Sequence, residues 1–409
     1  MDGTGKQSIE ANIPDNADLK PTGPPSSPGA RQWLVTLAAL LLPVVFFFGL
    51  LEGAARLYEM WNPPMRVDLG QGFDDSSRLF IPDPADRRMM VTNPDKAVSF
   101  KKQSFERVKP PRTLRVFALG GSSVNYLDYE FPLLAERLQK ESGWERVEII
   151  NCGGLSYGSH RLVLIAREIL HYEPDMVMIY SGHNEFEEMQ QMGLARVPFA
   201  PAQRLLARSA LYRFLRDWSA RRQIAGLEAA ARQRALANSI PDSSKSWAHV
   251  FTPEEIAGRM RDYRENLTAI ITLCRERNVP VVIGTVPSNL VKPSLPGREG
   301  ERYEQEVRPL FERGDFAAAA ALGREILRNA SPRHQSSDVE NGILRELSRE
   351  LSVPLADVEA AVIAAEPHGV PGETLFNDHC HLNPEGNKLL IREYEARLLE
   401  LMKGLPAKP

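Results

Sequence analysis

Short apolar runs alternate with amphipathic stretches from about residue 110 to the C-terminus. The runs of buried-strand type are Arg115–Leu119, Val147–Asn151, Met176–Tyr180, Val281–Val286 and Val353–Asp357. Between them, segments such as His160–Leu170 and Glu254–Glu276 carry apolar residues at helical spacing. This alternation predicts an α/β fold in which helices cover a parallel sheet.

Polar residues mark where two of these helices begin. Thr252 followed by Glu255 has the spacing of a capping box. Near the C-terminus, Asn383 precedes a proline that suits the first turn of a helix running to about Leu401. Both helices are therefore expected to begin at these caps.

Two long interruptions separate the regular elements, at about 190–250 and 300–340. The first is rich in alanine and arginine and predicts helices, either as a lid or, as we favour, as an insertion on the flank of the domain. The second contains a segment that resembles one unit of a helical repeat within Arg302–Asn329. A single unit cannot share its buried face with stacked neighbours, so we expect a local helical hairpin.

The N-terminal region predicts a membrane anchor. Trp33–Leu51 has 19 residues without a charge, which gives a helix of about 28 Å, close to the thickness of the hydrocarbon core. We expect a disordered cytoplasmic tail over 1–31, a transmembrane helix over 32–52, a linker over 53–109 and the α/β domain with its helical insertions over 110–409. A cleaved signal peptide is the alternative, but the polar lead is long for one. The flanking basic residues give little direction, and we expect the domain outside the cytoplasm.

Composition narrows the function classes. The formal net charge is −3, from 50 basic and 53 acidic residues, so no strong positive field favours nucleic acid as a partner. The cysteines are Cys152, Cys274 and Cys380, too few for a disulfide scaffold. A bridge between Cys152 and Cys380 is conceivable, but we expect unpaired thiols.

Glycine, serine and asparagine follow three of the expected strands directly. The segments are Gly120-Gly121-Ser122-Ser123, Asn151-Cys152-Gly153-Gly154 and Ser181-Gly182-His183-Asn184-Glu185. Because ligands of open α/β sheets bind at the carboxyl ends of the strands, these loops should converge on one site. Ser122 supplies a hydroxyl there, and Asn184 supplies an amide donor.

A base for that hydroxyl lies near the C-terminus. A serine hydroxyl is a poor nucleophile without a base, commonly a histidine that an acidic residue orients. Asp378 lies three residues before His381, so the carboxylate can reach one ring nitrogen and leave the other for Ser122. We expect these three residues to be catalytic. The oxyanion is expected to bind the N–H groups of Ser122 and Gly153 and the amide of Asn184.

Other interpretations of these motifs compete with this one. Gly154-Leu155-Ser156-Tyr157-Gly158 matches a G-x-S-x-G nucleophile elbow, which would make Ser156 the nucleophile of an α/β-hydrolase. The polar residues at 378–381 could suggest a metal, but a second pair of ligands is not evident, so we expect no metal and no cofactor. His183 could line the site, but we expect it to be hydrogen-bonded within its loop. Glu185 and Glu187 are expected on a solvated face or at the start of a helix.

The sequence resembles the SGNH hydrolases, also called GDSL-type lipases and esterases. Ser122, Gly153, Asn184 and His381 match the four defining residues in order, and Asp378 matches the acid of the triad. The resemblance covers roughly Arg115 to Leu401 and implies a flavodoxin-like, three-layer fold. Gly-Gly-Ser-Ser stands where the family has Gly-Asp-Ser-Leu, and Gly-His-Asn-Glu where it has Gly-x-Asn-Asp, which leaves the substrate class open.

The Gly-Gly-Ser form, the Gly-His-Asn-Glu-Phe segment and the N-terminal anchor together resemble bacterial envelope members of the family. This resemblance implies hydrolysis of acylated glycans or lipids through an acyl-enzyme. An O-acyltransferase of envelope polysaccharide with the same triad, and a non-catalytic glycan-binding module, are the alternatives.

Overall fold

The computed structural model describes most of the chain. The described residues are 30–61, 78–97, 99–188, 206, 208–215, 218, 222, 251–295, 297–330 and 333–405. They fall into two compact units, Met1–Asn62 and Pro63–Pro409. The expected tail lies almost wholly outside the described residues, as does most of the insertion expected at 190–250.

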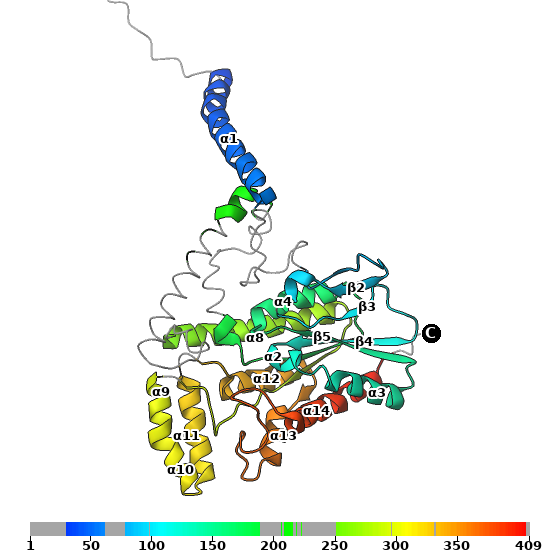
Figure 1. Ribbon diagram of the computed structural model, residues 1–409, viewed down its shortest axis with the longest axis vertical. Coiled ribbons are helices and arrows are strands. Elements are labelled where there is room, and N and C mark those ends of the chain that lie inside the picture. The colour runs from blue at the N-terminus through cyan, green and yellow to red at the C-terminus, as the bar shows by residue number, and fades with distance from the viewer. Residues whose placement is uncertain are drawn as a thin grey trace, which may run out of the picture. The chain divides into compact units, whose positions relative to one another are not determined.

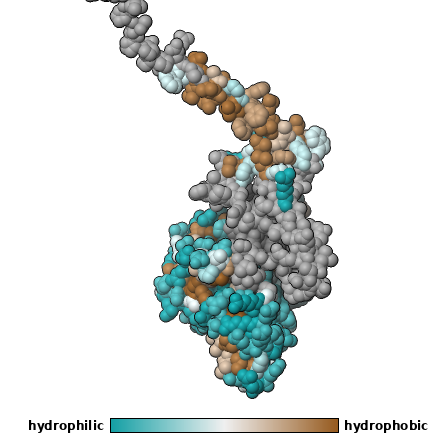
Figure 2. All heavy atoms as spheres, turned by 90° about the vertical axis from the view of Figure 1, so that its left-hand side faces the viewer, coloured by the Kyte–Doolittle hydropathy of each residue, from teal (hydrophilic) through white to brown (hydrophobic). Residues whose placement is uncertain are grey.

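The first unit contains the helix α1, Ala30–Trp61. Within it, Leu37–Trp61 is long and apolar enough to cross a membrane. Large apolar side chains such as Phe46 and Leu50 are exposed, and Figure 2 shows apolar atoms along the face of the helix turned to the viewer. The helix extends beyond the expected 32–52 because the residues that follow Leu51 continue in helical geometry.

The second unit is built on a parallel five-stranded sheet. Its strands are β4 (Thr113–Gly120), β5 (Arg146–Gly153), β6 (Met176–Tyr180), β7 (Val281–Gly284) and β8 (Leu355–Ala356). Their order in the sheet is β5-β4-β6-β7-β8, and each neighbouring pair is parallel. This is the flavodoxin-like order, in which the second strand lies outside the first. Each strand lies on one of the five predicted apolar runs, so the predicted fold class is confirmed.

Helices cover both faces of this sheet (Figure 1). The principal helices are α3 (Glu130–Ser142), α4 (Ser159–Ile169), α8 (Pro253–Glu276), α12 (Asp338–Leu351), α13 (Val358–Ala365) and α14 (Pro384–Met402). The helices α3 and α14 pack together on one face, and α4 and α8 pack together on the other. Thr252 and Glu255 form the predicted capping box, and the side chain of Asn383 caps α14.

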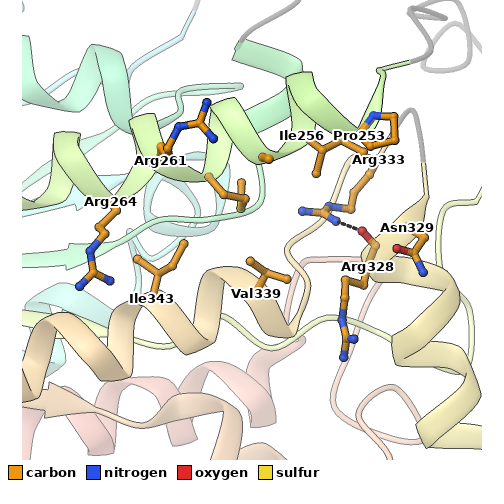
Figure 3. Close-up of a pocket in the computed structure, with 11 residues that line it drawn as sticks. Pro253, Ile256, Arg261, Arg264, Arg328, Asn329, Arg333, Val339 and Ile343 are labelled. Atoms are coloured by element: carbon orange, nitrogen blue, oxygen red, sulfur yellow. Dashed lines mark hydrogen bonds between the residues drawn. The ribbon is translucent and has the colours of Figure 1, made fainter.

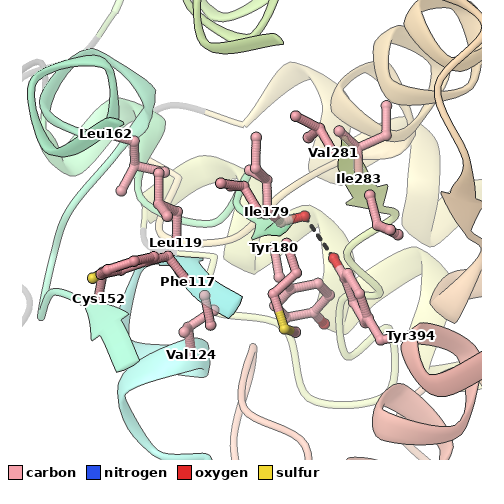
Figure 4. Close-up of a cluster of buried hydrophobic side chains, with 14 of the residues drawn as sticks. Phe117, Leu119, Val124, Cys152, Leu162, Ile179, Tyr180, Val281, Ile283 and Tyr394 are labelled. Atoms are coloured by element: carbon pink, nitrogen blue, oxygen red, sulfur yellow. Dashed lines mark hydrogen bonds between the residues drawn. The ribbon is translucent and has the colours of Figure 1, made fainter. Parts of the chain in front are cut away.

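The core lies between the sheet and these helices. All residues of β4 are buried, and Figure 4 shows Phe117, Leu119 and Ile179 among the side chains that fill the interior. A large apolar side chain buried in this way contributes roughly 1.5–3 kcal/mol. The hydroxyl of Tyr394 on α14 donates to the carbonyl of Ile179, which ties the last helix to the central strand.

The segment expected as a linker over 53–109 is instead largely part of the second unit. It contains the antiparallel strands β1 (Phe80–Pro82), β2 (Met89–Thr92) and β3 (Ser104–Glu106), and the short helix η1 (Pro94–Lys96). Phe80 and Phe105 are buried in the main core and make a T-shaped ring contact, with centroids 4.9 Å apart. The carboxylate of Glu168 accepts the N–H groups of Leu79 and Phe80, each at 2.8 Å. Strands of three or four residues show too little alternation to be recognised in the sequence.

The second interruption forms the expected helical hairpin. It comprises α9 (Gly297–Arg302), a π-helical turn η3 (Tyr303–Val307), α10 (Arg308–Glu312) and α11 (Phe316–Asn329). Tyr303 and Val307 pack against Ala319 and Ile326 in a small core of their own. The hairpin therefore stabilises itself locally.

Three loops begin at one edge of the sheet. Gly120, the last residue of β4, lies opposite Gly153 on β5 and Tyr180 on β6. The segments that follow these residues therefore start side by side, as the sequence analysis expects.

Candidate active site

Ser122 is the first residue of the short helix α2, Ser122–Asn125, which follows β4 after a single residue. That residue, Gly121, must be a glycine because a Cβ there would lie 2.2 Å from Nδ2 of Asn184. The nucleophile candidate is thus held beside the amide of Asn184. The side chain of Ser122 is partly exposed, so a ligand can reach it.

His381 and Asp378 reach Ser122 from the loop before α14. Nε2 of His381 lies 2.7 Å from Oγ of Ser122. Nδ1 of the same ring lies 2.7 Å from Oδ2 of Asp378. The other carboxylate oxygen of Asp378 accepts the N–H groups of Cys380 at 2.8 Å and His381 at 2.7 Å. The structure therefore brings the three predicted residues into one line of hydrogen bonds.

The charge of Asp378 suits this arrangement. Partial burial alone would raise the pKa of its carboxyl, but hydrogen bonds from the His381 ring and from two backbone N–H groups outweigh burial and hold the pKa well below its ordinary value. Asp378 is therefore ionised near neutral pH. An ionised carboxylate at Nδ1 leaves Nε2 as the acceptor for a proton from Ser122 and stabilises the imidazolium that results.

Two of the three expected oxyanion donors are available. The N–H of Ser122 has no acceptor among the described residues. Nδ2 of Asn184 uses one hydrogen on the carbonyl of Tyr157 at 3.2 Å, which leaves the second hydrogen for a ligand. Both donors lie next to Gly121: Ser122 follows it in the sequence, and Nδ2 of Asn184 lies 2.2 Å from its Cβ position.

Gly153 requires a correction. Its N–H donates to Oδ1 of Asn151 at 2.9 Å, so it is not available to an oxyanion. A Cβ at Gly153 would lie 2.2 Å from the backbone nitrogen of Asn125. Glycine is required there for the close packing of β5 against α2, a role that the sequence pattern alone does not distinguish from ligand binding.

Ser156, in the loop after β5, has a backbone N–H that could serve in place of that of Gly153. Its N–H has no acceptor among the described residues, and the next residue, Tyr157, has its carbonyl oxygen 3.1 Å from the Cβ position of Gly121. Its φ of 63° lies in the left-handed region, which is costly for a serine. The hydroxyl of Ser156 donates to Glu187 at 2.6 Å rather than to a histidine. This contact argues against Ser156 as the nucleophile.

Glu185 lies at the start of a helical turn, one of the two expected placements, but it is buried in an ion cluster and not on a solvated face. Nη2 of Arg259 lies 2.6 Å from Glu185 and 2.7 Å from Glu188. Glu188 also binds Arg161 at 2.8 Å, and the two glutamates accept N–H groups of the first turn of α4. Carboxylates are favourable at a helix N-terminus. The cluster therefore fixes the loop after β6 against the loop after β5.

His183 is hydrogen-bonded to a distant segment and not, as expected, within its own loop. Its Nδ1 accepts the N–H of Ser336 at 3.1 Å. Burial lowers the pKa of the ring to about 3, and the nearby His381 adds to the effect. The ring is therefore neutral and carries its proton on Nε2. It joins the loop after β6 to the segment before α12.

A candidate metal cluster overlaps the loop before α14. Asp378, His379 and Cys380 have ligand atoms within 4.8 Å of one another. However, the carboxylate of Asp378 is already bonded to His381, and burial raises the pKa of the Cys380 thiol well above its ordinary value, so it stays protonated. These residues therefore do not fit a metal as well as they fit the line to Ser122. All three cysteines are free, as expected, and the structure buries them.

A groove of about 640 Å³ lies apart from these residues, between α8 and α12 (Figure 3). Ile256, Met260 and Ile343 form part of its apolar lining. Arginines also line it, but Arg264 is paired with Glu346 and Glu350. No residue of the line to Ser122 lines this groove, so we do not assign the chemistry to it.

Removing the side-chain donor of Asn184 tests the oxyanion site. We expect Asn184→Ala to lower kcat for an ester by about 10²–10³-fold, because one preorganised donor to the transition state is lost. The thermal unfolding temperature should change little, since the hydrogen bond to Tyr157 is a single 3.2 Å contact. Asn184→Asp, which keeps the shape but replaces the donor by a carboxylate, should be no more active. A loss below threefold in a stable Asn184→Ala protein would exclude this role.

Comparisons with known proteins give structural similarity only. No protein-family model matches the chain, and no curated protein matches it. A carbohydrate esterase family 3 structure from Talaromyces cellulolyticus is 12% identical, with a TM-score of 0.37, and covers 72% of this chain and 100% of its own. An acetyl xylan esterase structure is 15% identical, with a TM-score of 0.36. The match covers 69% of this chain and 98% of the esterase chain.

A GDSL-like lipase from Bacteroides thetaiotaomicron is 11% identical, with a TM-score of 0.35. The match covers 71% of this chain and 88% of the lipase chain. Similarity at this level does not establish an activity. The assignment of the site rests on the hydrogen bonds described above. The chain has a flavodoxin-like parallel sheet whose carboxyl edge carries a hydrogen-bonded serine, histidine and aspartate, and the solved structures similar to it include a GDSL-like lipase and an SGNH-hydrolase family esterase.

Proposed function

We propose that this protein is an ester hydrolase of the SGNH type that acts through an acyl-enzyme on Ser122. The observation that carries the proposal is the continuous line from Asp378 through His381 to Ser122, with both contacts at 2.7 Å. Such a line is what a serine needs to become a nucleophile near neutral pH.

The reaction has two acyl-transfer steps. Oγ of Ser122 attacks the ester carbonyl while Nε2 of His381 takes its proton, and Asp378 stabilises the imidazolium. The N–H groups of Ser122 and Ser156 and the amide of Asn184 stabilise the oxyanion of the tetrahedral intermediate. His381 then returns the proton to the departing alcohol. In the second step, water attacks the acyl-enzyme while Nε2 of His381 takes its proton. His381 then returns that proton to Oγ of Ser122 as the acyl–oxygen bond breaks and the acid is released.

We also propose the place and the substrate class. The helix α1 supports a single-pass anchor, and we place the catalytic domain outside the cytoplasm, where acylated glycans or lipids of the cell envelope would be its substrates. In that setting the anchor keeps the catalytic domain close to the envelope substrate.

One labelling experiment tests nucleophile and orientation together. A membrane-impermeant fluorophosphonate should label the full-length protein at Ser122 in spheroplasts with an intact cytoplasmic membrane, because a phosphonate captures an activated serine. The adduct is located by peptide mass spectrometry. Labelling only after the membrane is ruptured would contradict the orientation, whereas no adduct on Ser122 in either preparation would contradict the catalytic proposal. An adduct on Ser156 would favour the rival nucleophile.

A further inference from the structure

An exposed aromatic ring stands directly beside the histidine of the site. The rings of Tyr126 and His381 have their centroids 5.1 Å apart, with 58° between their planes. Tyr126 is 49% exposed, although a ring of this size usually gains by burial. The reaction as derived above makes no use of it.

Backbone contacts fix the position of Tyr126 beside the site. The N–H of Tyr126 donates to the carbonyl of Ser122 at 3.0 Å, so its position is tied to the nucleophile. Leu127, the next residue, is fully buried and anchors the turn. The backbone of Tyr126 is therefore fixed, and only the side-chain torsions of the ring remain to be ordered when a ligand binds.

Charged groups border the same ring. Nζ of Lys101 lies 6.0 Å from the centroid of Tyr126 and 2.7 Å from the carboxylate of Asp128. The side chains of Lys101 and Asp128 are 42% and 36% exposed. The face of Tyr126 can contact C–H groups of a ligand, while Lys101 can donate hydrogen bonds to its hydroxyl groups and Asp128 can accept them.

The position of Tyr126 relative to the reaction defines which part of the ester it meets. His381 gives its proton to the departing alcohol, so a group packed against its ring borders the alcohol part of the substrate. Asn184 and Ser156, in contrast, belong to the oxyanion side. We propose that Tyr126 is a substrate-binding wall on which the alcohol part of the ester stacks as a sugar ring, with Lys101 and Asp128 near its hydroxyls. This inference rests on the proposed function and makes an acylated glycan the substrate class.

The chemistry of the wall favours a sugar over a lipid. The face of an aromatic ring carries partial negative charge, which attracts the polarised C–H groups on one face of a pyranose. A lipid alcohol would instead gain most from a continuous apolar surface, and the charged pair of Lys101 and Asp128 interrupts any such surface at this ring.

The test compares three acetate esters on the full-length protein in detergent. The esters are a mono-O-acetylated methyl glucopyranoside, ethyl acetate and octyl acetate. We expect Tyr126→Ala to raise KM for the acetylated pyranoside by about tenfold, with a much smaller change in kcat, because stacking energy is lost in both ground and transition states. Tyr126→Trp should retain the low KM, since it keeps an aromatic face.

Tyr129→Ala is the matched control, because Tyr129 is also exposed, at 86%. This variant should leave the KM for each of the three esters unchanged.

Each other outcome overturns the inference. A fall in kcat of equal size for all three esters would mean that Tyr126 only positions His381. A selective rise in KM for octyl acetate would assign the wall to a lipid. If the wild-type protein hydrolyses ethyl and octyl acetate but not the pyranoside, the sugar wall fails while the proposed function stands. If it hydrolyses none of the three, or if Ser122→Ala is as active as wild type, the proposed function itself fails and this inference with it.

Discussion

Ser122→Ala is expected to lower kcat/KM for ester hydrolysis by about 10⁵-fold, because without the nucleophile no acyl-enzyme forms and only the oxyanion donors and binding remain. The hydroxyl lies 2.7 Å from Nε2 of His381, so its removal takes away both the attacking atom and the proton that the base accepts. The measurement is the initial rate with a short-chain aryl ester, using protein whose unfolding temperature matches that of the wild type.

Two serines provide matched controls for this prediction. Ser123 is the neighbouring residue in α2, and Ser123→Ala should retain activity within about threefold because its hydroxyl is not in the line to Asp378. Ser156→Ala removes the rival nucleophile of the G-x-S-x-G motif but keeps a backbone N–H. It should remain far more active than Ser122→Ala. Full activity in Ser122→Ala together with none in Ser156→Ala would reverse the assignment of the nucleophile.

Arg259→Met is expected to destabilise the folded domain by roughly 3–5 kcal/mol, because removing one partner leaves buried carboxylates without their counter-charge. Arg259 is 4% exposed, and both of its partners, Glu185 and Glu188, are fully buried. Arg161 would still pair with Glu188, but Glu185 would keep only hydrogen bonds from Ser159. The measurement is the free energy of unfolding from denaturant titration.

A second arginine on the same helix is the control. Arg264 also binds two carboxylates, those of Glu346 and Glu350, but these partners are about half exposed and water screens the charges. Arg264→Met should therefore cost less than about 1 kcal/mol. Equal losses in the two variants would show that burial of the cluster does not determine its contribution. Because the cluster joins the loops after β5 and β6, the activity that remains in folded Arg259→Met should also fall.

The fold could be predicted from the sequence to the extent that each element has its own local signal. The run that became β6 is continuously apolar and that of β4 is apolar after Arg115, and the predicted bounds of β6 match the structure. The capping box at Thr252 needs only contacts within one turn. The strands β1 to β3 have no such signal, because their burial depends on partners such as Tyr172, far along the chain from Phe80.

The catalytic side chains could be predicted from the sequence because few residue types can act as nucleophile, base or acid. A serine after a strand, together with an aspartate three residues before a histidine, is typical of a hydrogen-bonded series such as that from Asp378 through His381 to Ser122. The donors for the oxyanion were not predictable in the same way, since every residue except proline has a backbone N–H. Only the folded chain shows that the N–H of Gly153 is taken by Asn151 and that the N–H of Ser156 is not.

The sequence by itself determined the order of the strands of the five-stranded sheet along the chain, the apolar helix near the N-terminus and the identity of the nucleophile, base and acid candidates, because hydrophobic periodicity and side-chain chemistry are local properties. The tertiary structure alone decided which backbone groups remain free at the site, that Glu185 is buried opposite Arg259, and that Tyr126 stands exposed beside His381. The physical reason is that burial and hydrogen-bond pairing depend on segments brought together from distant parts of the chain, and no local pattern records which partner a group will find.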